Sequence, residues 1–289
     1  MPLTKDKYFE LIDSNSDYPH FRCALGAYIP GSLYKYFSIP DDSDEARKRF
    51  EQLKSGEIWF SKRSGLNDPF EFEHIALKGA QNDARQYYLN KQQELEVCCF
   101  SALLYNKLMW SHYAAGYKGY CVEFRVESPE RFYPVIYENE VPDLSQEYQR
   151  FYDMRNEMCA NPSLVLNNYE NRKVLLRINY PLFSKDTCWS YEEEYRILDS
   201  STVSNGELQQ MTTNGLRVTK IIAGAFCTDL NFQRLKEVAG ALNVPLSKIS
   251  FDPPAYRAIN VSWRTYESTG TTTTTVYAVY RADDATGKN

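Results

Sequence analysis

The sequence lacks the features that mark membrane, secreted and zinc-binding proteins. Its 289 residues hold no apolar run near the roughly 20 residues of a membrane-spanning helix, and residues 1–7 show no basic segment leading into an apolar one. The 7 cysteines include no Cys-x-x-Cys pair and no His–Cys spacing typical of structural zinc. We therefore expect a soluble cytoplasmic protein with reduced thiols, most of them buried.

The chain also lacks an excess of positive charge and any visible internal repeat. Its formal net charge is -5, so nucleic-acid binding would need a local basic patch. Hydrophobic residues make up 43% of the chain, which is enough for a sizeable core. The 23 tyrosines exceed the 15 phenylalanines, and tyrosine suits clefts and interfaces as well as cores.

Short strands and helices follow one another without a simple βαβ order, which predicts an α+β fold with a mixed or antiparallel sheet. Predicted strands cover residues 32–37, 57–61, 97–101, 119–124, 132–137, 189–198, 218–224 and 256–261, and predicted helices cover 44–54, 81–96, 107–114, 143–177 with a break near 161–162, and 231–242. Residues 199–215 are predicted to form a loop.

Three parts of the chain differ in composition. We expect residues 1–30 to be a loosely attached lead-in with a short helix, and residues 31–264 to form a single α+β domain. Residues 265–289 form a Thr-rich polar tail. Threonine favours extended structure, so this tail is expected either to pair as an edge strand or to be disordered.

The segment 187–198 is the strongest candidate for a functional element. As a strand it would place Glu192, Glu194 and Arg196 on one face, because side chains alternate along a strand. Tyr195 and Ile197 would anchor the other face in the core. Two carboxylates and a guanidinium could then form the polar floor of a pocket. The alternative is an exposed edge strand whose charges neutralise one another, with little effect on stability.

Two other segments have both a structural and a functional interpretation. The loop 66–71 places Asp68 and Glu71 either at the rim of a cleft or in an ordinary turn shaped by Asn, Asp and Pro. His112 stands beside Trp110 and Tyr113, where it would serve either as a general base or as a hydrogen-bonded core histidine.

Several motifs in succession resemble a bacterial family catalogued as domain of unknown function 2971. They are Leu-Tyr-Lys-Tyr at 33–36, Ile-Trp-Phe-Ser at 58–61, Leu-Asn-Asp-Pro-Phe-Glu at 66–71, Cys-Phe-Ser at 99–101, Met-Trp-Ser-His-Tyr-Ala at 109–114, Lys-Gly-Tyr-Cys-Val-Glu-Phe at 118–124, the segment 189–196 and Ile-Ile-Ala-Gly at 221–224. The resemblance runs from about Leu33 to Val261. The family label implies no established activity.

A more distant resemblance is to ADP-ribosyltransferases. These enzymes carry an early strand with an Arg or His, a middle strand with a Ser or Tyr, and a late strand with the catalytic Glu, in one branch as Glu-x-Glu. The late signature is matched by Glu192 and Glu194, and the middle one by Ser61. The early strand corresponds to Tyr34 and Lys35, where Lys35 differs from the Arg or His of the family.

The second resemblance implies a bacterial toxin or defence effector that uses NAD as substrate, as a transferase or an NAD glycohydrolase. Glu194 would stabilise the positive charge that develops on the ribose, and Glu192 would prepare the acceptor. Trp110 or Tyr113 would stack on a flat ring of NAD, beside Tyr34 and Ser61. Arg196 and Lys35 would meet the pyrophosphate. The acceptor would be a protein or a nucleic acid, with no membrane involved.

Two alternatives belong to other classes of protein. A metal-dependent nuclease could draw oxygen ligands for magnesium from Asp68, Glu71, Glu123, Glu192 and Glu194. A non-enzymatic binding module could instead use a tyrosine-rich cleft to hold a small molecule or a protein. A cleft that unites Tyr34, Ser61 and Glu194 would favour the transferase. Asp68, Glu71 and Glu194 within coordination reach of one another would favour the nuclease, and the absence of both groups would favour the binding module.

Overall fold

The computed structural model describes residues 2–15, 17–41, 43–72, 82–140, 142–161, 163, 168–201, 206–252, 260–267, 270–272 and 278–279. Contacts divide the chain into two compact units, each discontinuous in sequence. The first consists of Met1–Gly31, Trp59–Ala102 and Glu127–Gly215, and the second of Ser32–Ile58, Leu103–Val126 and Leu216–Asn289. The domain boundaries expected from the sequence stay a prediction.

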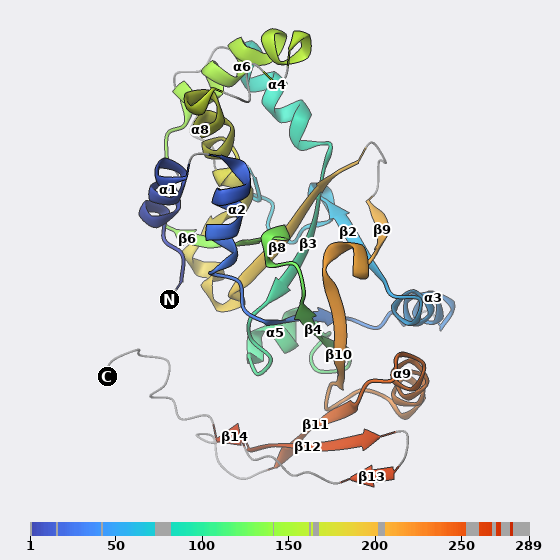
Figure 1. Ribbon diagram of the computed structural model, residues 1–289. Helices are drawn as coiled ribbons and strands as arrows, with labels where there is room; N and C mark the ends of the chain where they lie inside the picture. Colours follow the sequence, from blue (N-terminus) through green and yellow to red (C-terminus); the bar gives the residue numbers. More distant parts are fainter. Residues whose placement is uncertain are drawn as a thin grey trace. The chain divides into compact units, whose positions relative to one another are not determined.

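The first unit contains a sheet in which β8 (Glu194–Ser200) lies between two antiparallel neighbours (Figure 1). One is β3 (Leu95–Ser101), with Cys99 opposite Arg196, and the other is β5 (Phe132–Pro134), with Tyr133 opposite Arg196. The sheet continues from β3 to β2 (Glu57–Lys62) and β9 (Glu207–Gln210). A separate parallel pair joins β6 (Ile136–Glu138) to β7 (Ser184–Asp186).

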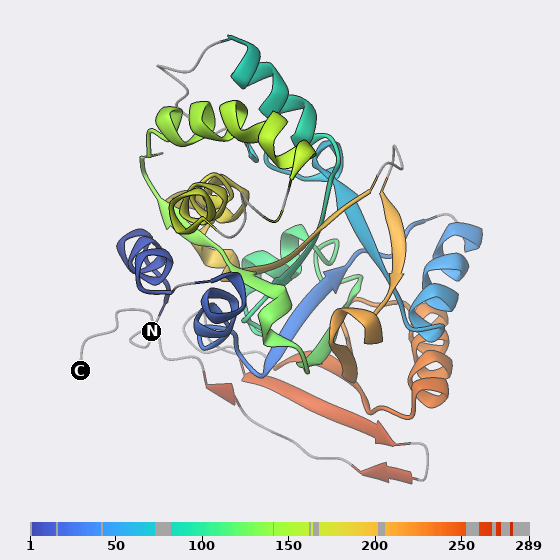
Figure 2. The same cartoon turned by 45° about the horizontal axis from the view of Figure 1, so that its top comes forward.

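The helices with described bounds in the first unit are α1 (Lys5–Ser14), α2 (Tyr18–Gly26), α4 (Asn82–Gln92), α6 (Ser145–Ala160) and α8 (Tyr169–Arg177). Helices α1 and α2 begin at the side-chain caps Thr4 and Asp17, which accept hydrogen bonds from free backbone N–H groups. Figure 2 shows α1 beside α2, and α4 beside α6, in agreement with the contacts between them.

The N-terminal helices are part of the core of the first unit. Tyr8 and Ile12 of α1, and Phe21 and Leu25 of α2, are at most 1% exposed and belong to one apolar cluster. The Tyr8 hydroxyl donates to the Leu176 carbonyl oxygen at 2.9 Å. The sequence predicted one short helix here in a loosely attached segment, whereas the structure has two packed helices, because both bury an apolar stripe.

The second unit contains a sheet ordered β13–β12–β11–β10–β4–β1, with β14 also paired to β12. Its strands are β1 (Ser32–Phe37), β4 (Tyr120–Val126), β10 (Leu216–Ala223), β11 (Leu246–Asp252), β12 (Asn260–Glu267), β13 (Gly270–Thr272) and β14 (Ala278–Val279). The pair β10–β11 is parallel, whereas β1–β4, β4–β10, β11–β12 and β12–β13 are antiparallel.

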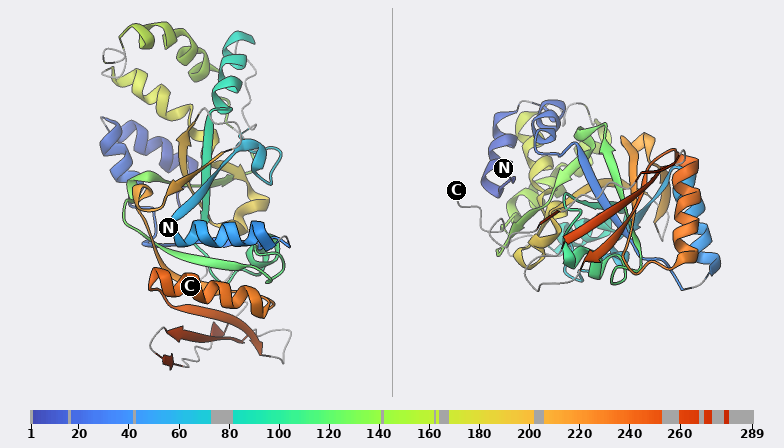
Figure 3. Two further views of the ribbon diagram at one scale, coloured as in Figure 1. Left: turned by 90° about the vertical axis from the view of Figure 1, so that its right-hand side faces the viewer. Right: turned by 90° about the horizontal axis from the view of Figure 1, so that it is seen from below.

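The second unit also contains α3 (Ser43–Lys54), α5 (Lys107–His112) and α9 (Asp229–Leu242). Helices α3 and α9 are in contact, and Figure 3 shows them side by side in blue and orange. Their periodic apolar residues are buried, among them Phe50 and Leu53 of α3 and Leu235 and Val238 of α9. The predicted α+β class, with a mixed and mostly antiparallel arrangement of strands, is confirmed in both units.

The structure corrects several predicted elements. The predicted strand 132–137 is two strands with different partners, and Pro134 ends the first of them, because proline has no N–H to donate. The predicted loop 199–215 contains β9, and β11 was missed. Residues 256–259 of the predicted strand 256–261 lie outside the described residues, and β12 begins at Asn260. The start of the Thr-rich tail is paired as a strand, since residues 265–267 at the end of β12 lie opposite 270–272 of β13.

The largest correction concerns the segment 187–198. Residues Thr187–Glu192 form a 3-10 helix, and the strand begins only at Glu194. Between them Glu193 adopts a left-handed backbone conformation with φ 40°, which ends the helix and turns the chain into β8. The other 3-10 helices described are Arg63–Gly65, Pro129–Arg131, Tyr180–Phe183 and Thr212–Asn214.

Candidate functional site

Five charged side chains meet inside the first unit, and none of them is more than 5% exposed. This charge cluster consists of Glu71, Lys185, Glu192, Glu194 and Arg196. Three carboxylates face two cations, so the cluster holds one more negative than positive charge when all five groups are ionised. Charged side chains are rarely buried to this extent unless they are paired.

Arg196 is fully buried, and its planar guanidinium connects the carboxylates of Glu194 and Glu71. Its Nε donates to Glu194 Oε1 at 2.8 Å, and its Nη2 donates to Glu194 Oε2 at 3.0 Å, which makes the pair bidentate. Nη2 also donates to Glu71 Oε1, and Nη1 donates to the Leu182 carbonyl oxygen at 2.7 Å. Every nitrogen of the guanidinium is therefore used.

Lys185 connects all three carboxylates. Its Nζ lies 2.7 Å from Glu192 Oε2, 3.1 Å from Glu194 Oε2 and 3.5 Å from Glu71 Oε2. The same ammonium lies 4.9 Å from the centroid of the Trp189 ring, within the range of a cation–π contact. The contacts with Glu192 and Glu194 are hydrogen bonds, so they use two of the three donors of the ammonium.

The cluster shifts the pKa values of its members. Burial by itself raises the pKa of the Glu194 carboxyl, but Arg196 and Lys185 outweigh burial and hold that pKa well below its usual value. Burial lowers the pKa of Lys185, and the three glutamates, with Glu194 first, raise it above its usual value. The structure therefore holds Glu194 as a carboxylate and Lys185 as an ammonium at neutral pH.

Tyr137 contacts the charge cluster at the backbone of Glu194. Its hydroxyl oxygen accepts a hydrogen bond from the Glu194 backbone N–H at 2.8 Å, at the first residue of β8. Burial and then the Glu194 charge raise the pKa of this phenol well above its usual value, so it stays protonated. A neutral phenol at this position supports the start of the strand that carries Glu194 and Arg196.

Local backbone structure explains how residues distant in sequence meet. Glu194 and Arg196 share a face because they are two apart on β8. The Phe70 backbone N–H donates to Asp68 Oδ1 at 2.9 Å in an Asx turn, and this turn places Glu71 toward Arg196. Asp68 thus shapes the chain, as the structural interpretation of this loop expected, whereas Glu71 takes part in the site.

Glu192 reaches the cluster by a different path from the one predicted. It does not share a strand face with Glu194, because it ends the 3-10 helix and the left-handed Glu193 follows. Its carboxylate meets Glu194 through Lys185, which stands on β7. The Ser101 hydroxyl donates to the Glu192 carbonyl oxygen at 2.6 Å and holds this turn against β3.

The remaining predicted site residues are distributed over both units. Ser61 lies on β2, opposite Val97, in the first unit. Tyr34 and Lys35 lie on β1 of the second unit, opposite Glu123 and Val122. Burial, followed by the Glu123 charge, raises the pKa of Tyr34 to about 12. Their assignment to an NAD site stays a prediction.

Trp110 and Tyr113 also belong to the second unit. Trp110 is 1% exposed, and its indole N–H donates to the Leu104 carbonyl oxygen at 2.8 Å. Its ring stacks on Tyr117 with centroids 5.5 Å apart. Tyr113 is half-buried at the end of α5. Trp110 therefore occupies the interior of its own unit, and the predicted contact of these rings with NAD stays untested.

The carboxylates proposed for a magnesium site do not form one group of ligands. Glu71 and Glu194 share Arg196, while Glu123 lies on β4 of the second unit. Within the described ranges, no group of three or more His, Cys, Asp or Glu side chains is arranged to hold a metal ion. Over the same residues, no helix has the length and apolar character needed to cross a membrane.

Comparison with known proteins identifies one family. A family model described as "Protein of unknown function (DUF2971)" matches residues 109–197, which confirms the expected resemblance over that part of the chain. The matched segment includes Lys185, Glu192, Glu194 and Arg196, whereas Glu71 lies outside it. No curated protein and no solved structure matches the chain. The family description states no activity.

Sequence reasoning missed the part played by Lys185. No local pattern singles it out, because its three carboxylate partners come from a loop, a 3-10 helix and a strand. The one available signal was indirect. A strand face with two carboxylates and one guanidinium is short of positive charge once it is buried, so a second cation was to be expected from elsewhere.

Proposed function

We propose that this protein is a bacterial cytoplasmic enzyme with ADP-ribosyltransferase-like or NAD glycohydrolase activity, and that Glu194 is its catalytic carboxylate. The observation that supports the proposal is the meeting of Glu192 and Glu194 in one buried cluster with Arg196. The Glu-x-Glu spacing of the transferases requires two such carboxylates in one space. In this proposal Glu194 acts on NAD, and Glu192 prepares an acceptor, which is a protein or a nucleic acid.

The energetics of the cluster also favour a functional role. Buried ion pairs lose so much hydration that apolar residues of similar volume are often as stabilising, or more so by about 1–4 kcal/mol. Stability alone therefore does not explain why five charged side chains, with one more negative than positive charge, are buried together. Strongly perturbed ionisable groups occur preferentially at functional sites. The cluster keeps Glu194 negatively charged, which is the state that stabilises a developing positive charge.

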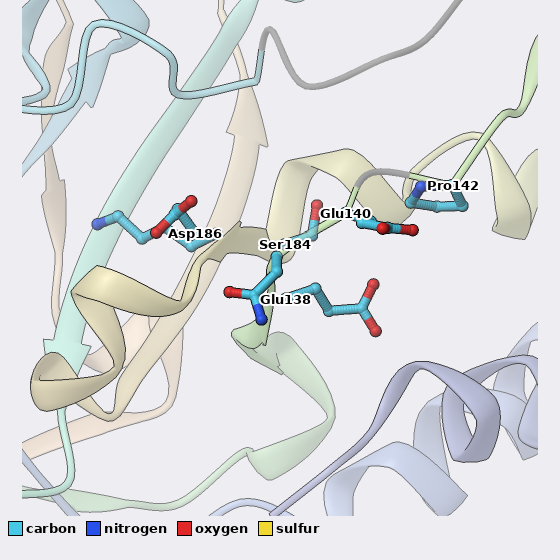
Figure 4. A pocket seen from close by; sticks show the side chains of 7 residues that line it. Glu138, Glu140, Pro142, Ser184 and Asp186 are labelled. Atoms are coloured by element: carbon cyan, nitrogen blue, oxygen red, sulfur yellow. The ribbon is translucent and has the colours of Figure 1, made fainter.

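The cavity described beside the cluster is much smaller than a typical ligand pocket. The cavity that reaches the cluster at Lys185 has a volume of about 40 Å³ and is lined by Glu138, Asn139, Glu140, Pro142, Ser184, Lys185 and Asp186 (Figure 4). This space suits a water molecule or two, whereas ligand pockets usually measure about 300–1,000 Å³.

The test is a direct assay of nicotinamide release and of label transfer from NAD to proteins and nucleic acids of a lysate. Glu194→Gln should lower nicotinamide release by roughly a hundredfold or more, the scale of one lost electrostatic contact in a transition state. Glu192→Gln should affect label transfer more than nicotinamide release. Glu193→Gln is the matched control, because it makes the same chemical change at an exposed residue outside the cluster.

Stability must be measured in parallel, because Glu194 is buried and paired. Its 5% exposure and its contacts with Arg196 and Lys185 predict a destabilised variant, in contrast to the exposed edge strand considered from the sequence. Lys62→Gln provides a control for destabilisation, since Lys62 is buried in the first unit but pairs with Glu96 instead. Activity of folded Glu194→Gln equal to wild type would leave the cluster as a structural element.

A further inference from the structure

A second cavity of the first unit is large enough for a small molecule. It has a volume of about 720 Å³, within the usual range for ligand pockets. We call it the arginine pocket. Its lining residues come from α2, the 3-10 helix Pro129–Arg131, β5 and β8, and they include Tyr18, Arg22, Glu130, Arg131, Tyr133 and Asp199.

Two arginines line this pocket, and each has an unused donor. Arg22 is 6% exposed; its Nε donates to the Glu130 carbonyl oxygen at 2.8 Å and its Nη2 to the Phe132 carbonyl oxygen at 3.0 Å. Arg131 Nη2 donates to Asn214 Oδ1 at 2.9 Å. Arg22 Nη1 and Arg131 Nε are buried and have no hydrogen-bond partner among the described residues. Buried donors are normally satisfied, and a bound anion would satisfy them.

The backbone contacts of Arg22 hold its guanidinium in one place. Three hydrogen bonds to the carbonyl oxygens of Glu130 and Phe132 tie it to the segment that leads into β5. Its Cζ lies 3.7 Å from the centroid of the Tyr133 ring, so the guanidinium stacks on that ring. No carboxylate neutralises Arg22 in an ion pair described here, so its positive charge is available to a ligand.

Aromatic and acidic groups complete the pocket. The Tyr18 and Tyr133 hydroxyls lie 3.2 Å apart, and Tyr18 is 50% exposed, so part of its ring surface is open. Asp199 accepts hydrogen bonds from the Ser200 backbone N–H at 2.8 Å and from Gln209 Nε2 at 3.1 Å. Glu130 is exposed at the edge. Two arginines and two acidic residues suit a ligand with both an anionic group and hydrogen-bond donors better than a bare anion.

We propose that the arginine pocket binds a nucleotide-class ligand, with its phosphate on Arg22 and Arg131 and its flat ring against Tyr18. Hydroxyl or amino groups of the ligand donate to Asp199 or Glu130. The volume, the two cations and the open aromatic face carry this inference. It does not rest on the proposed transferase activity, because it concerns binding at residues outside the charge cluster.

Calorimetric titration of the full-length protein with ADP, pyrophosphate and adenosine tests the proposal. ADP should bind, and pyrophosphate and adenosine should each bind more weakly, because each lacks half of the contacts. Arg131→Gln should weaken ADP binding roughly tenfold to a hundredfold, the effect of losing a charge-assisted hydrogen bond. Tyr18→Ala should weaken ADP and adenosine but leave pyrophosphate unchanged, and it removes an exposed side chain with little risk to folding.

Matched controls separate the pocket from the rest of the protein. Arg47→Gln removes an exposed arginine of α3 and should leave ADP affinity unchanged. Calorimetry measures ligand binding and the nicotinamide assay measures catalysis, so a negative result in one is distinguishable from a negative result in the other. Absence of ADP binding to the wild type at millimolar concentration would overturn the proposal. So would equal ADP affinity in Arg131→Gln, or equal affinity of the wild type for pyrophosphate and ADP.

Discussion

Replacing Arg196 by methionine should destabilise the first unit more than any exposed charge substitution. The side chain is 0% exposed and supplies hydrogen bonds to Glu194, to Glu71 and to the Leu182 carbonyl oxygen. Methionine keeps much of the volume, so the change removes the charge and the donors without a large cavity. The three carboxylates of the cluster then remain buried with Lys185 as their only cation among the described residues.

The size of the effect follows from these contacts. Removal of one partner of a buried ion pair costs about 3–5 kcal/mol, and an unpaired backbone carbonyl adds about 1 kcal/mol or more. Lys185 lies 3.1 Å from Glu194 and 3.5 Å from Glu71, and it limits the loss at both carboxylates. We expect a total of about 4–6 kcal/mol, which is a large share of the roughly 5–15 kcal/mol that stabilises a typical domain.

Urea unfolding followed by circular dichroism and tryptophan fluorescence measures this loss. Arg196→Lys keeps the charge but not the planar fork, so it should cost less and remain folded if Arg196→Met does not. Arg47→Met is the control, since the Arg47 side chain is 67% exposed and its pair with Asp44 is worth at most about 1 kcal/mol. Equal losses for Arg196→Met and Arg47→Met would refute the claim that the charge cluster is buried and coupled.

Two further predictions concern pH and the second unit. The pKa of Glu194 is lowered in the folded protein, so its contribution is present above the unfolded pKa of about 4.3 and is lost as pH falls through the folded value. The unfolding free energy of the wild type should therefore fall more steeply below about pH 4 than that of Glu194→Gln, and parallel curves would contradict this. Trp110→Ala should cost about 3–5 kcal/mol, as a buried aromatic truncation does, and a loss below about 1 kcal/mol would contradict its burial.

Local patterns in the sequence predicted most of the elements correctly. The apolar period of residues 44–54 and 231–242 predicted α3 and α9, because a helix that packs on one side needs an apolar stripe of that period. Runs of bulky and β-branched residues predicted β1, β3, β4 and β10. The mixed order of these elements was enough to predict the α+β class.

The sequence by itself also determined that Glu194 and Arg196 act together, because any strand places residues two apart on one face. Tertiary structure decided the rest of the candidate site. Lys185 and Glu71 join it through the β6–β7 pair and an Asx turn, and Arg22 faces the arginine pocket only because α2 packs beside β5. Such contacts join residues far apart in the chain, and their formation depends on packing and burial, which no short sequence pattern encodes.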